Sequence, residues 1–124
     1  TVLLVDDDEI VREITSMVLE KLGFKVLSAR DGVEAVEVFQ QHRDEIRFVL
    51  TDYAMPRMNG LETLATLRQI APRIPVILAS GYSEEEVMGG SHSEHPQVFL
   101  EKPYSLQKLK DAIQHSLADS VGLP

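Results

Sequence analysis

The chain has 124 residues, 44% of them hydrophobic and 26% charged, which suits one globular domain with its own core. Twenty acidic and twelve basic residues give a net charge of −8, which argues against direct binding to nucleic acid or an anionic membrane, because both require a basic surface. The lack of cysteine excludes disulfides and thiolate chemistry and suits a cytoplasmic location, and no apolar run reaches the roughly 18–20 residues of a membrane span.

Short apolar segments alternate with segments of helical periodicity along the chain. Five apolar runs rich in β-branched residues predict strands that are buried on both faces of a parallel sheet. These runs are Val2–Val5, Lys25–Ser28, Phe48–Thr51, Val76–Ala79 and Val98–Leu100. Elsewhere, apolar residues recur three or four positions apart, which predicts amphipathic helices. These helical stripes are Ile10, Ile14, Met17, Val18 and Leu22; Val33, Val36 and Phe39; Leu61, Leu64 and Leu67; and Leu106, Leu109, Ile113 and Leu117.

Capping residues mark where the helices begin. A Ser, Asn or Asp followed three residues later by Glu is typical of a capping box. Three such pairs occur, and Ser105 is a further candidate cap; the pairs are Asp31 with Glu34, Asn59 with Glu62, and Ser83 with Glu86.

The fourth helix is predicted to be short, beginning near Ser83 and ending by about Gly89. Val87 and Met88 are its only large apolar residues, so little buried area holds it in place. Two glycines and Pro96 interrupt the segment that leads to the fifth strand, and we expect residues 88–97 to be the most mobile part of the domain.

Strict strand–helix alternation predicts an α/β fold in which helices cover both faces of an open parallel sheet. Ligands of such sheets bind at the carboxyl ends of the strands. The residues at these ends are Asp6, Asp7 and Asp8 after the first strand, Asp52 after the third, Ser80 after the fourth and Lys102 after the fifth.

These strand ends predict a phosphoryl-transfer site. Two carboxylates about 4 Å apart repel each other by about 4 kcal/mol at an effective dielectric near 20, so they either shift their pKa values or recruit a cation. Oxygen ligands favour Mg²⁺, which would lower the barrier to attack by the Asp52 carboxylate on an anionic phosphoryl group. Lys102 would add a second positive charge and Ser80 a hydroxyl donor. Each residue alone is more typical of a solvated turn, and only their joint placement carries the prediction.

Four stretches resemble the receiver domain of two-component response regulators: VLLVDDDEIVRE, VLTDYAMPRMNGLE, PVILASGY and FLEKP. The resemblance covers essentially the whole chain and implies a flavodoxin-like, doubly wound (βα)5 fold with strand order 2-1-3-4-5. The stretch SGYSEEE is most similar to receivers fused to hybrid sensor histidine kinases. Because the chain begins at Thr1 rather than Met, we expect residues 1–124 to be a single receiver domain cut from a longer protein.

The resemblance assigns a role to each residue of the site. It implies that Asp6 and Asp7 position Mg²⁺, that Asp52 is both phosphoacceptor and metal ligand, and that the backbone carbonyl of Ala54 completes the protein ligands. Lys102 would contact the phosphoryl group, and its bond to Pro103 is predicted to be cis. Asp8 matches none of these roles and is predicted to cap the first helix.

The resemblance also implies a conformational switch. Phosphorylation would draw Ser80 inward and let Phe99 rotate, which would alter the face built from the fourth helix, fifth strand and fifth helix. This face could also support a homodimer. The expected partner is a histidine kinase or phosphotransfer domain that supplies a phosphohistidine. The domain would be a signalling module and no enzyme, catalysing only its own phosphorylation and dephosphorylation.

Three other functions share parts of this pattern. A pseudo-receiver would act without phosphorylation, but the acidic, hydroxyl and lysine positions here are intact. A haloacid-dehalogenase-like phosphatase needs a second Asp two residues after its nucleophile, where this chain has Ala54. A flavodoxin-like cofactor binder would place a flavin phosphate against acids that repel it. His92 and His95 could bind a transition metal, although solvated side chains in a polar loop are the preferred interpretation.

Overall fold

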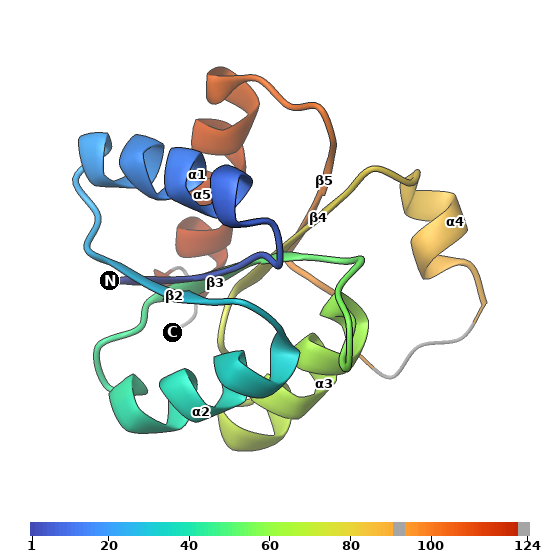
Figure 1. Cartoon of the computed structure of the whole chain (residues 1–124), viewed down its shortest axis with the longest axis horizontal. Helices are drawn as coiled ribbons and strands as arrows, with labels where there is room; N and C mark the ends of the chain where they lie inside the picture. Colours follow the sequence, from blue (N-terminus) through green and yellow to red (C-terminus); the bar gives the residue numbers. More distant parts are fainter. Residues whose placement is uncertain (91–93, 122–124) are drawn as a thin grey trace.

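A computed structural model describes residues 1–90 and 94–121, with side chains up to Ala118. Five parallel strands form one sheet in the order β2-β1-β3-β4-β5, which confirms the predicted fold (Figure 1). The strands are β1 (Val2–Val5), β2 (Val26–Ala29), β3 (Phe48–Asp52), β4 (Val76–Ser80) and β5 (Val98–Glu101). The helices of the described residues are α1 (Glu9–Lys21), α2 (Gly32–His42), α3 (Gly60–Ile70), α4 (Glu84–Met88) and α5 (Leu106–Val121).

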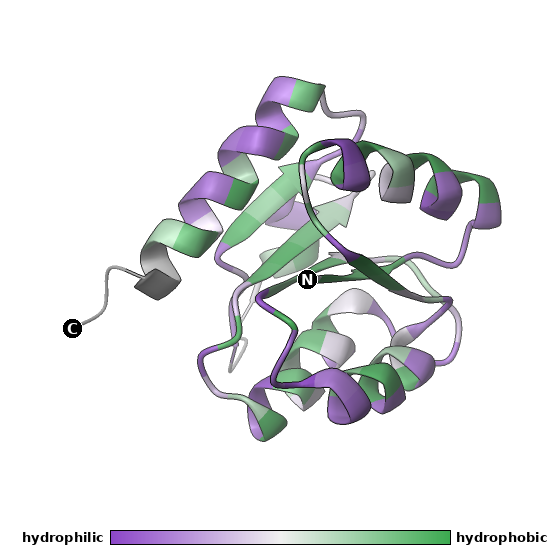
Figure 2. Cartoon of the chain, turned by 90° about the vertical axis from the view of Figure 1, so that its left-hand side faces the viewer, coloured by the Kyte–Doolittle hydropathy of each residue, from purple (hydrophilic) through white to green (hydrophobic). Residues whose placement is uncertain are grey.

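Helices cover both faces of the sheet. Side chains of β1 alternate between the two layers, with Val2 and Leu4 facing α1 and α5 and with Leu3 and Val5 facing α2 and α3. The central strands β1, β3 and β4 are therefore buried on both sides, which is why they are largely hydrophobic runs, whereas the edge strands β2 and β5 are only partly buried. Figure 2 shows that the strands are largely apolar and lie between helices that carry both polar and apolar residues.

The strand bounds differ slightly from the prediction. The second strand is displaced by one residue, because its pairing with β1 continues through Ala29, a small residue with weak strand propensity. Three other strands extend one residue further than predicted, to Asp52, Ser80 and Glu101. As a result, Asp52 and Ser80 are the last residues of their strands and are held by pairing with Ala79 and Glu101, respectively.

Most of the predicted helix caps are confirmed. The side chains of Asp8, Asn59, Ser83 and Ser105 each accept a hydrogen bond from a backbone N–H in the following first turn. Complete capping boxes occur at Asn59 and Ser83.

The predicted capping box at Asp31 is only half right. Asp31 accepts the N–H of Glu34 at 2.9 Å, but the Glu34 carboxylate binds the N–H of Arg30 instead of closing the box. The reason is an ion pair of 3.3 Å between Glu34 and the Arg30 guanidinium, which draws the carboxylate one residue further back.

The apolar stripe predicted for the first helix does not form its buried face. Ile10, Ile14 and Met17 are 69%, 57% and 59% exposed, while Leu19, which lies outside the stripe, is fully buried. Only Val18 and Leu22 of the stripe pack against the core. Periodicity identified the apolar positions correctly, but Ile10, Ile14 and Met17 are turned toward solvent and form an apolar surface on α1.

The short fourth helix is confirmed. It spans five residues, with Ser83 as its N-cap and Gly89 as its C-cap, and Val87 is its one buried residue. Figure 1 shows α4 standing away from the other helices, at the side of the sheet formed by β4 and β5. Three consecutive glutamates lie in its first turn, where negative charge interacts favourably with the positive end of the helix dipole.

We expect the amides of α4 to exchange with solvent at least about tenfold faster than those of α5 in the unphosphorylated protein. A five-residue helix with one buried side chain opens locally, whereas Leu109, Ala112 and Ile113 bury α5 in the core. Hydrogen-exchange mass spectrometry of peptides from both helices measures this difference. Equal protection would mean that α4 is a stable helix.

Candidate functional site

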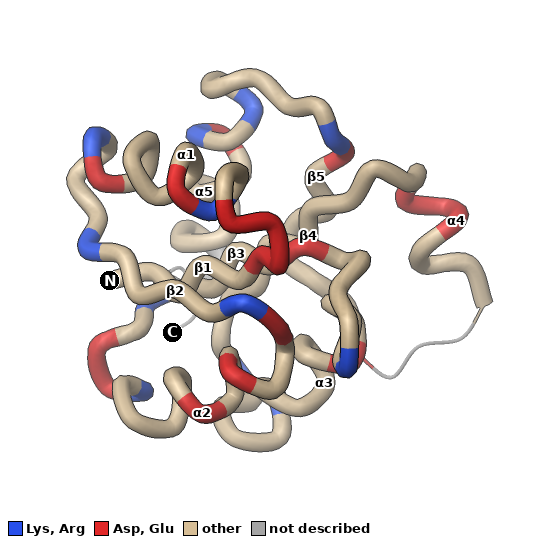
Figure 3. The backbone as a smooth tube through the Cα atoms, viewed as in Figure 1, with Lys and Arg blue, Asp and Glu red and all other residues tan. Residues whose placement is uncertain are grey.

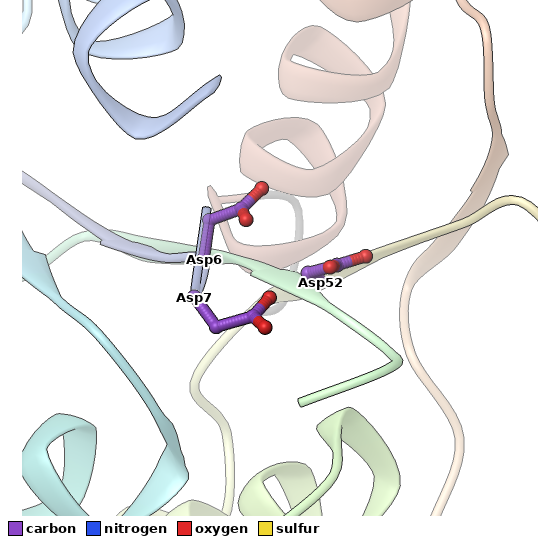
Figure 4. Close-up of side chains that lie close together, drawn as sticks. All are labelled: Asp6, Asp7 and Asp52. Carbon is purple, nitrogen blue, oxygen red and sulfur yellow. The ribbon is translucent and has the colours of Figure 1, made fainter. Parts of the chain in front are cut away.

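Three carboxylates gather where β1 and β3 end. The two strands are neighbours, and Val5 pairs with Thr51, so Asp6 and Asp52 follow at the same edge. With Asp7, each offers one oxygen, and these oxygens lie within 4.8 Å of one another (Figure 4). Asp6 is buried and Asp7 is exposed, so the cluster lies at the boundary between core and solvent.

Lys102 brings a positive charge to these acids from β5. Its Nζ lies 3.0 Å from Oδ1 of Asp52 and 3.8 Å from Oδ2 of Asp6. The Lys102 N–H donates to the carbonyl of Ser80 at 2.7 Å, which ties the residue to the end of β4. The bond to Pro103 is cis, as predicted. The structure therefore brings together residues of the predicted site that are up to 96 positions apart in the sequence.

Burial and charge shift two pKa values in this cluster. Burial, followed by the charges of Asp52 and Asp7, raises the pKa of Asp6 above its ordinary value, although an N–H from Asp8 opposes the shift. Burial alone would lower the pKa of Lys102, but its hydrogen bond to Asp52 and the two nearby carboxylates raise it. The lysine therefore remains an ammonium group at neutral pH.

The cluster fits a hard divalent cation. Three carboxylates and one ammonium leave two negative charges, which one Mg²⁺ balances. Oxygens on opposite sides of a Mg²⁺ lie about 4.2 Å apart, so small side-chain rotations suffice to bring the acids to one ion. Among the described residues, the hydrogen bond and ion pair of Asp52 both use Oδ1, which leaves Oδ2 available for chemistry.

The loop after Asp52 is packed tightly beneath the site. Its base is closed by the N–H of Gly60, which donates to the carbonyl of Tyr53 at 2.8 Å. A Cβ on Gly60 would lie 2.5 Å from the carbonyl oxygen of Asp52, so only glycine allows this approach. Ala54 is exposed in this loop, two residues beyond Asp52, where its carbonyl was predicted to serve as a ligand.

The predicted switch residues lie on the neighbouring strands. Ser80 is buried at the end of β4, and its hydroxyl accepts a hydrogen bond from the N–H of Tyr82 at 2.9 Å. Phe99 is half-buried on β5 and lines a groove between this strand and α5 together with Lys108 and Asp111. Tyr82 also makes an edge-to-face contact with Tyr53, with ring centroids 6.3 Å apart, which the sequence did not suggest.

Sequence reasoning missed a groove beside the site, because helical periodicity does not show which apolar residues of α1 remain exposed. The groove has a volume of about 780 Å³ and lies between α1 and the start of α5. Its lining includes Lys102, whose Nζ lies 3.0 Å from Asp52, and its apolar walls include Val11, Ile14 and Leu106. Acidic residues of the β1–α1 turn and the end of β3 lie at the same end of the sheet (Figure 3).

Within residues 1–90 and 94–118, no second cluster of acidic or histidine side chains is close enough to hold a metal. His95 joins no such group, and His92 lies outside the described residues. No helix in the described part of the chain is long and apolar enough to cross a membrane.

Comparisons with known proteins agree with this geometry. Residues 2–114 match the model of the response regulator receiver domain. The chain is 36% identical over 117 residues to sensor kinase CckA of Brucella abortus, a match that covers 94% of the chain and 12% of that kinase. The chain thus spans about one eighth of this curated relative.

Two solved structures have the same fold. A response regulator receiver domain protein from Clostridium thermocellum has a TM-score of 0.88 at 27% identity, covering 99% of this chain and 98% of that one. A chain of the CheX–CheY–BeF3–Mg²⁺ complex from Borrelia burgdorferi has a TM-score of 0.81 at 26% identity, covering 99% and 89%. The phosphatase and flavin-binding alternatives are therefore wrong, and the chain belongs to the response regulator receiver domains, the signalling modules of two-component systems.

Proposed function

We propose that Asp52 accepts a phosphoryl group from a phosphohistidine and that Asp6, Asp7 and the Ala54 carbonyl hold the required Mg²⁺. The observation that carries this proposal is the meeting of three carboxylates and Lys102 at one edge of the sheet. The two negative charges left in this cluster match one divalent cation. The related complex from Borrelia burgdorferi has Mg²⁺ in its name, which supports the choice of metal.

In the proposed reaction, an Asp52 carboxylate oxygen attacks phosphorus, forming an acyl phosphate. The bond from phosphorus to the histidine nitrogen breaks, and its electron pair returns to the imidazole. When bound, Mg²⁺ would supply positive charge that offsets the negative charges of the carboxylates and of the phosphoryl group. Lys102, already 3.0 Å from Asp52, pairs with the oxygens of the arriving group. The domain would thus catalyse only its own phosphorylation and dephosphorylation.

Incubation with acetyl phosphate and Mg²⁺ is expected to add one phosphoryl group to the chain, and chelation of the metal should stop the reaction.

Asp7→Asn is expected to weaken Mg²⁺ binding at least about tenfold, because it removes a charged ligand. Its thermal stability should be unchanged or higher, because an exposed acid beside two others is lost. Calorimetric titration with Mg²⁺ measures the affinity.

Asp44→Asn is the matched control for this titration, because Asp44 is an exposed acid in the turn after α2. It lowers the net negative charge by the same amount but should leave Mg²⁺ affinity nearly unchanged. An equal loss of Mg²⁺ affinity in both variants would indicate that the net negative charge of the protein, rather than a specific ligand, attracts the ion.

Phosphorylation is proposed to act on the face formed by α4, β5 and α5. The Ser80 hydroxyl would leave the N–H of Tyr82 and turn toward the phosphoryl oxygens. Phe99 would then rotate into the space that Ser80 leaves. Since β5 is an edge strand and α4 has one buried residue, these two elements can rearrange with little loss of packing, and the face could support a homodimer.

The phosphohistidine donor is proposed to dock along α1. A histidine on a helical kinase or phosphotransfer domain must approach Asp52 from outside, and the α1 groove reaches the site through Lys102. The exposed apolar residues Ile10, Ile14 and Met17 would be covered by such a helix. The match to a sensor kinase supports a parent protein of that class, with this domain in the cytoplasm.

Ile14→Asn is expected to slow phosphoryl transfer from the phosphohistidine donor about tenfold while leaving labelling by acetyl phosphate unchanged. Ile14 is 57% exposed, so the change removes apolar contact area from the partner and none from the core. Rapid-quench transfer assays and mass spectrometry measure the two rates. Loss of both rates together would indicate a distorted Asp52 site.

A further inference from the structure

Arg57 lies in the loop between β3 and α3 with an unusual backbone conformation. Its φ of 66° lies in the left-handed region. Among the described residues, Arg57 is the one non-glycine residue with a positive φ. Glycine adopts this conformation without steric cost, whereas arginine adopts it only at a cost, because its Cβ lies too close to the backbone. An arginine at this position indicates that its side chain contributes something that offsets the strain.

The side chain of Arg57 binds the N-cap of α2. Its Nη2 and Nε donate to the same oxygen, Oδ2 of Asp31, at 2.7 and 3.1 Å. The other oxygen of Asp31 accepts the N–H of Glu34. That backbone hydrogen bond first, and Arg57 in addition, hold the pKa of Asp31 below its ordinary value despite burial, so the carboxylate stays charged at neutral pH.

This ion pair joins two segments that are 26 residues apart and sets the position of the loop tip. The loop also packs closely on α2, since a Cβ on Gly32 would lie 2.8 Å from two side-chain carbons of Met58. At its other end, the loop is closed by the hydrogen bond from Gly60 to Tyr53. Ala54 is an exposed residue of this loop between Tyr53 and Arg57, and the side chain of the next residue, Met55, packs against the core.

We infer that Arg57, through its two hydrogen bonds to Asp31, is a positioning residue that holds the Ala54 carbonyl in place for the divalent cation. The inference rests on the proposed function, because it assumes that Mg²⁺ binds the acidic cluster. Arg57 would touch neither the metal nor the phosphoryl group. Its effect would reach the site through Met55 and Pro56, which join it to Ala54 along the chain.

The sign of the effect separates positioning from simple electrostatics. Removal of a positive charge near a cation site should, by charge alone, strengthen Mg²⁺ binding. Loss of positioning should weaken it, because a mobile loop presents its carbonyl less often in the binding geometry. Arg57→Met therefore gives opposite results under the two explanations. Its side chain is 60% exposed, so the change removes little packing.

Calorimetric Mg²⁺ titrations of wild type and variants test this inference. Arg57→Met and Asp31→Asn are each expected to bind Mg²⁺ about tenfold more weakly, at the low end for loss of an outer partner of a metal ligand. Asparagine retains the N-cap of α2, so Asp31→Asn removes the charge and keeps the helix. The double variant should be about tenfold weaker rather than a hundredfold, because both changes break the same contact.

Two further variants control for strain and charge. Arg57→Gly relieves the backbone strain and should also bind about tenfold more weakly, whereas Arg57→Lys should recover part of the affinity. Wild-type affinity or tighter binding in Arg57→Met and Arg57→Gly would overturn the inference and leave the proposed function standing. A wild-type chain that binds no Mg²⁺ would overturn both.

Discussion

Asp52→Asn is expected to abolish phosphorylation of the domain by acetyl phosphate and Mg²⁺. An amide has no carboxylate oxygen to attack phosphorus, and it no longer carries the charge that Lys102 balances at 3.0 Å. Asparagine keeps the size of the side chain and can still accept the N–H of Tyr53, so β3 should remain intact. Intact-mass spectrometry should show one added phosphoryl group on wild type and none on the variant.

Asp8→Asn is a matched control for this experiment. Asp8 is a nearby acid on the same edge of the sheet, but its carboxylate caps α1 through the N–H groups of Ile10 and Val11. Asparagine caps helices as well as aspartate does, so this variant should be labelled at close to the wild-type rate. Undiminished labelling of Asp52→Asn would place the phosphoacceptor elsewhere. Mg²⁺ binding by a wild type that takes no label would favour the pseudo-receiver alternative.

Gly60→Ala is expected to destabilise the domain by about 2–4 kcal/mol. The new methyl group would lie 2.5 Å from the Asp52 carbonyl oxygen and 2.9 Å from the Cα of Tyr53. Backbone atoms cannot rotate away as a flexible side chain does, so α3 must shift from the end of β3. Helix propensity alone predicts the opposite sign, since alanine favours a helix by about 1 kcal/mol over glycine. Urea unfolding at equilibrium measures the difference.

Gly81→Ala provides the comparison for this stability measurement. A Cβ at Gly81 would meet nothing within 4 Å, and its φ lies outside the left-handed region. Its stability should change by less than about 0.5 kcal/mol. Similar losses in the two variants would mean that glycine is needed at both positions for a reason other than steric contact.

The fold and the acidic cluster could be predicted because each depends on local sequence. Strands covered on both faces are continuous apolar runs, and parallel strands place their carboxyl ends at one edge. Asp6, Asp52 and Lys102 could therefore be brought together without knowledge of any contact between them. The confirmed short α4 was predictable for the same reason, because Gly89 and the few apolar residues before it act locally.

The remainder depends on contacts between distant segments. Periodicity showed that α1 has an apolar face but not which neighbour covers it, so the exposure of Ile14 could not be predicted. The pairing of Arg57 with Asp31 joins residues 26 positions apart, and neither residue type is unusual in a polar loop. Arg68 behaves similarly, because its contacts with Glu94 and Gln97 exist only once α3 and β5 have assembled.

The outward apolar face of α1 also bears on the colloidal behaviour of the protein. Large exposed apolar side chains on one helix promote self-association, which like charges on the whole molecule oppose. The net charge of −8 at neutral pH therefore keeps copies of this chain apart while that face is uncovered. As the pH falls and carboxylates are protonated, the repulsion decreases, and light scattering should detect association through α1 that Ile14→Asn reduces.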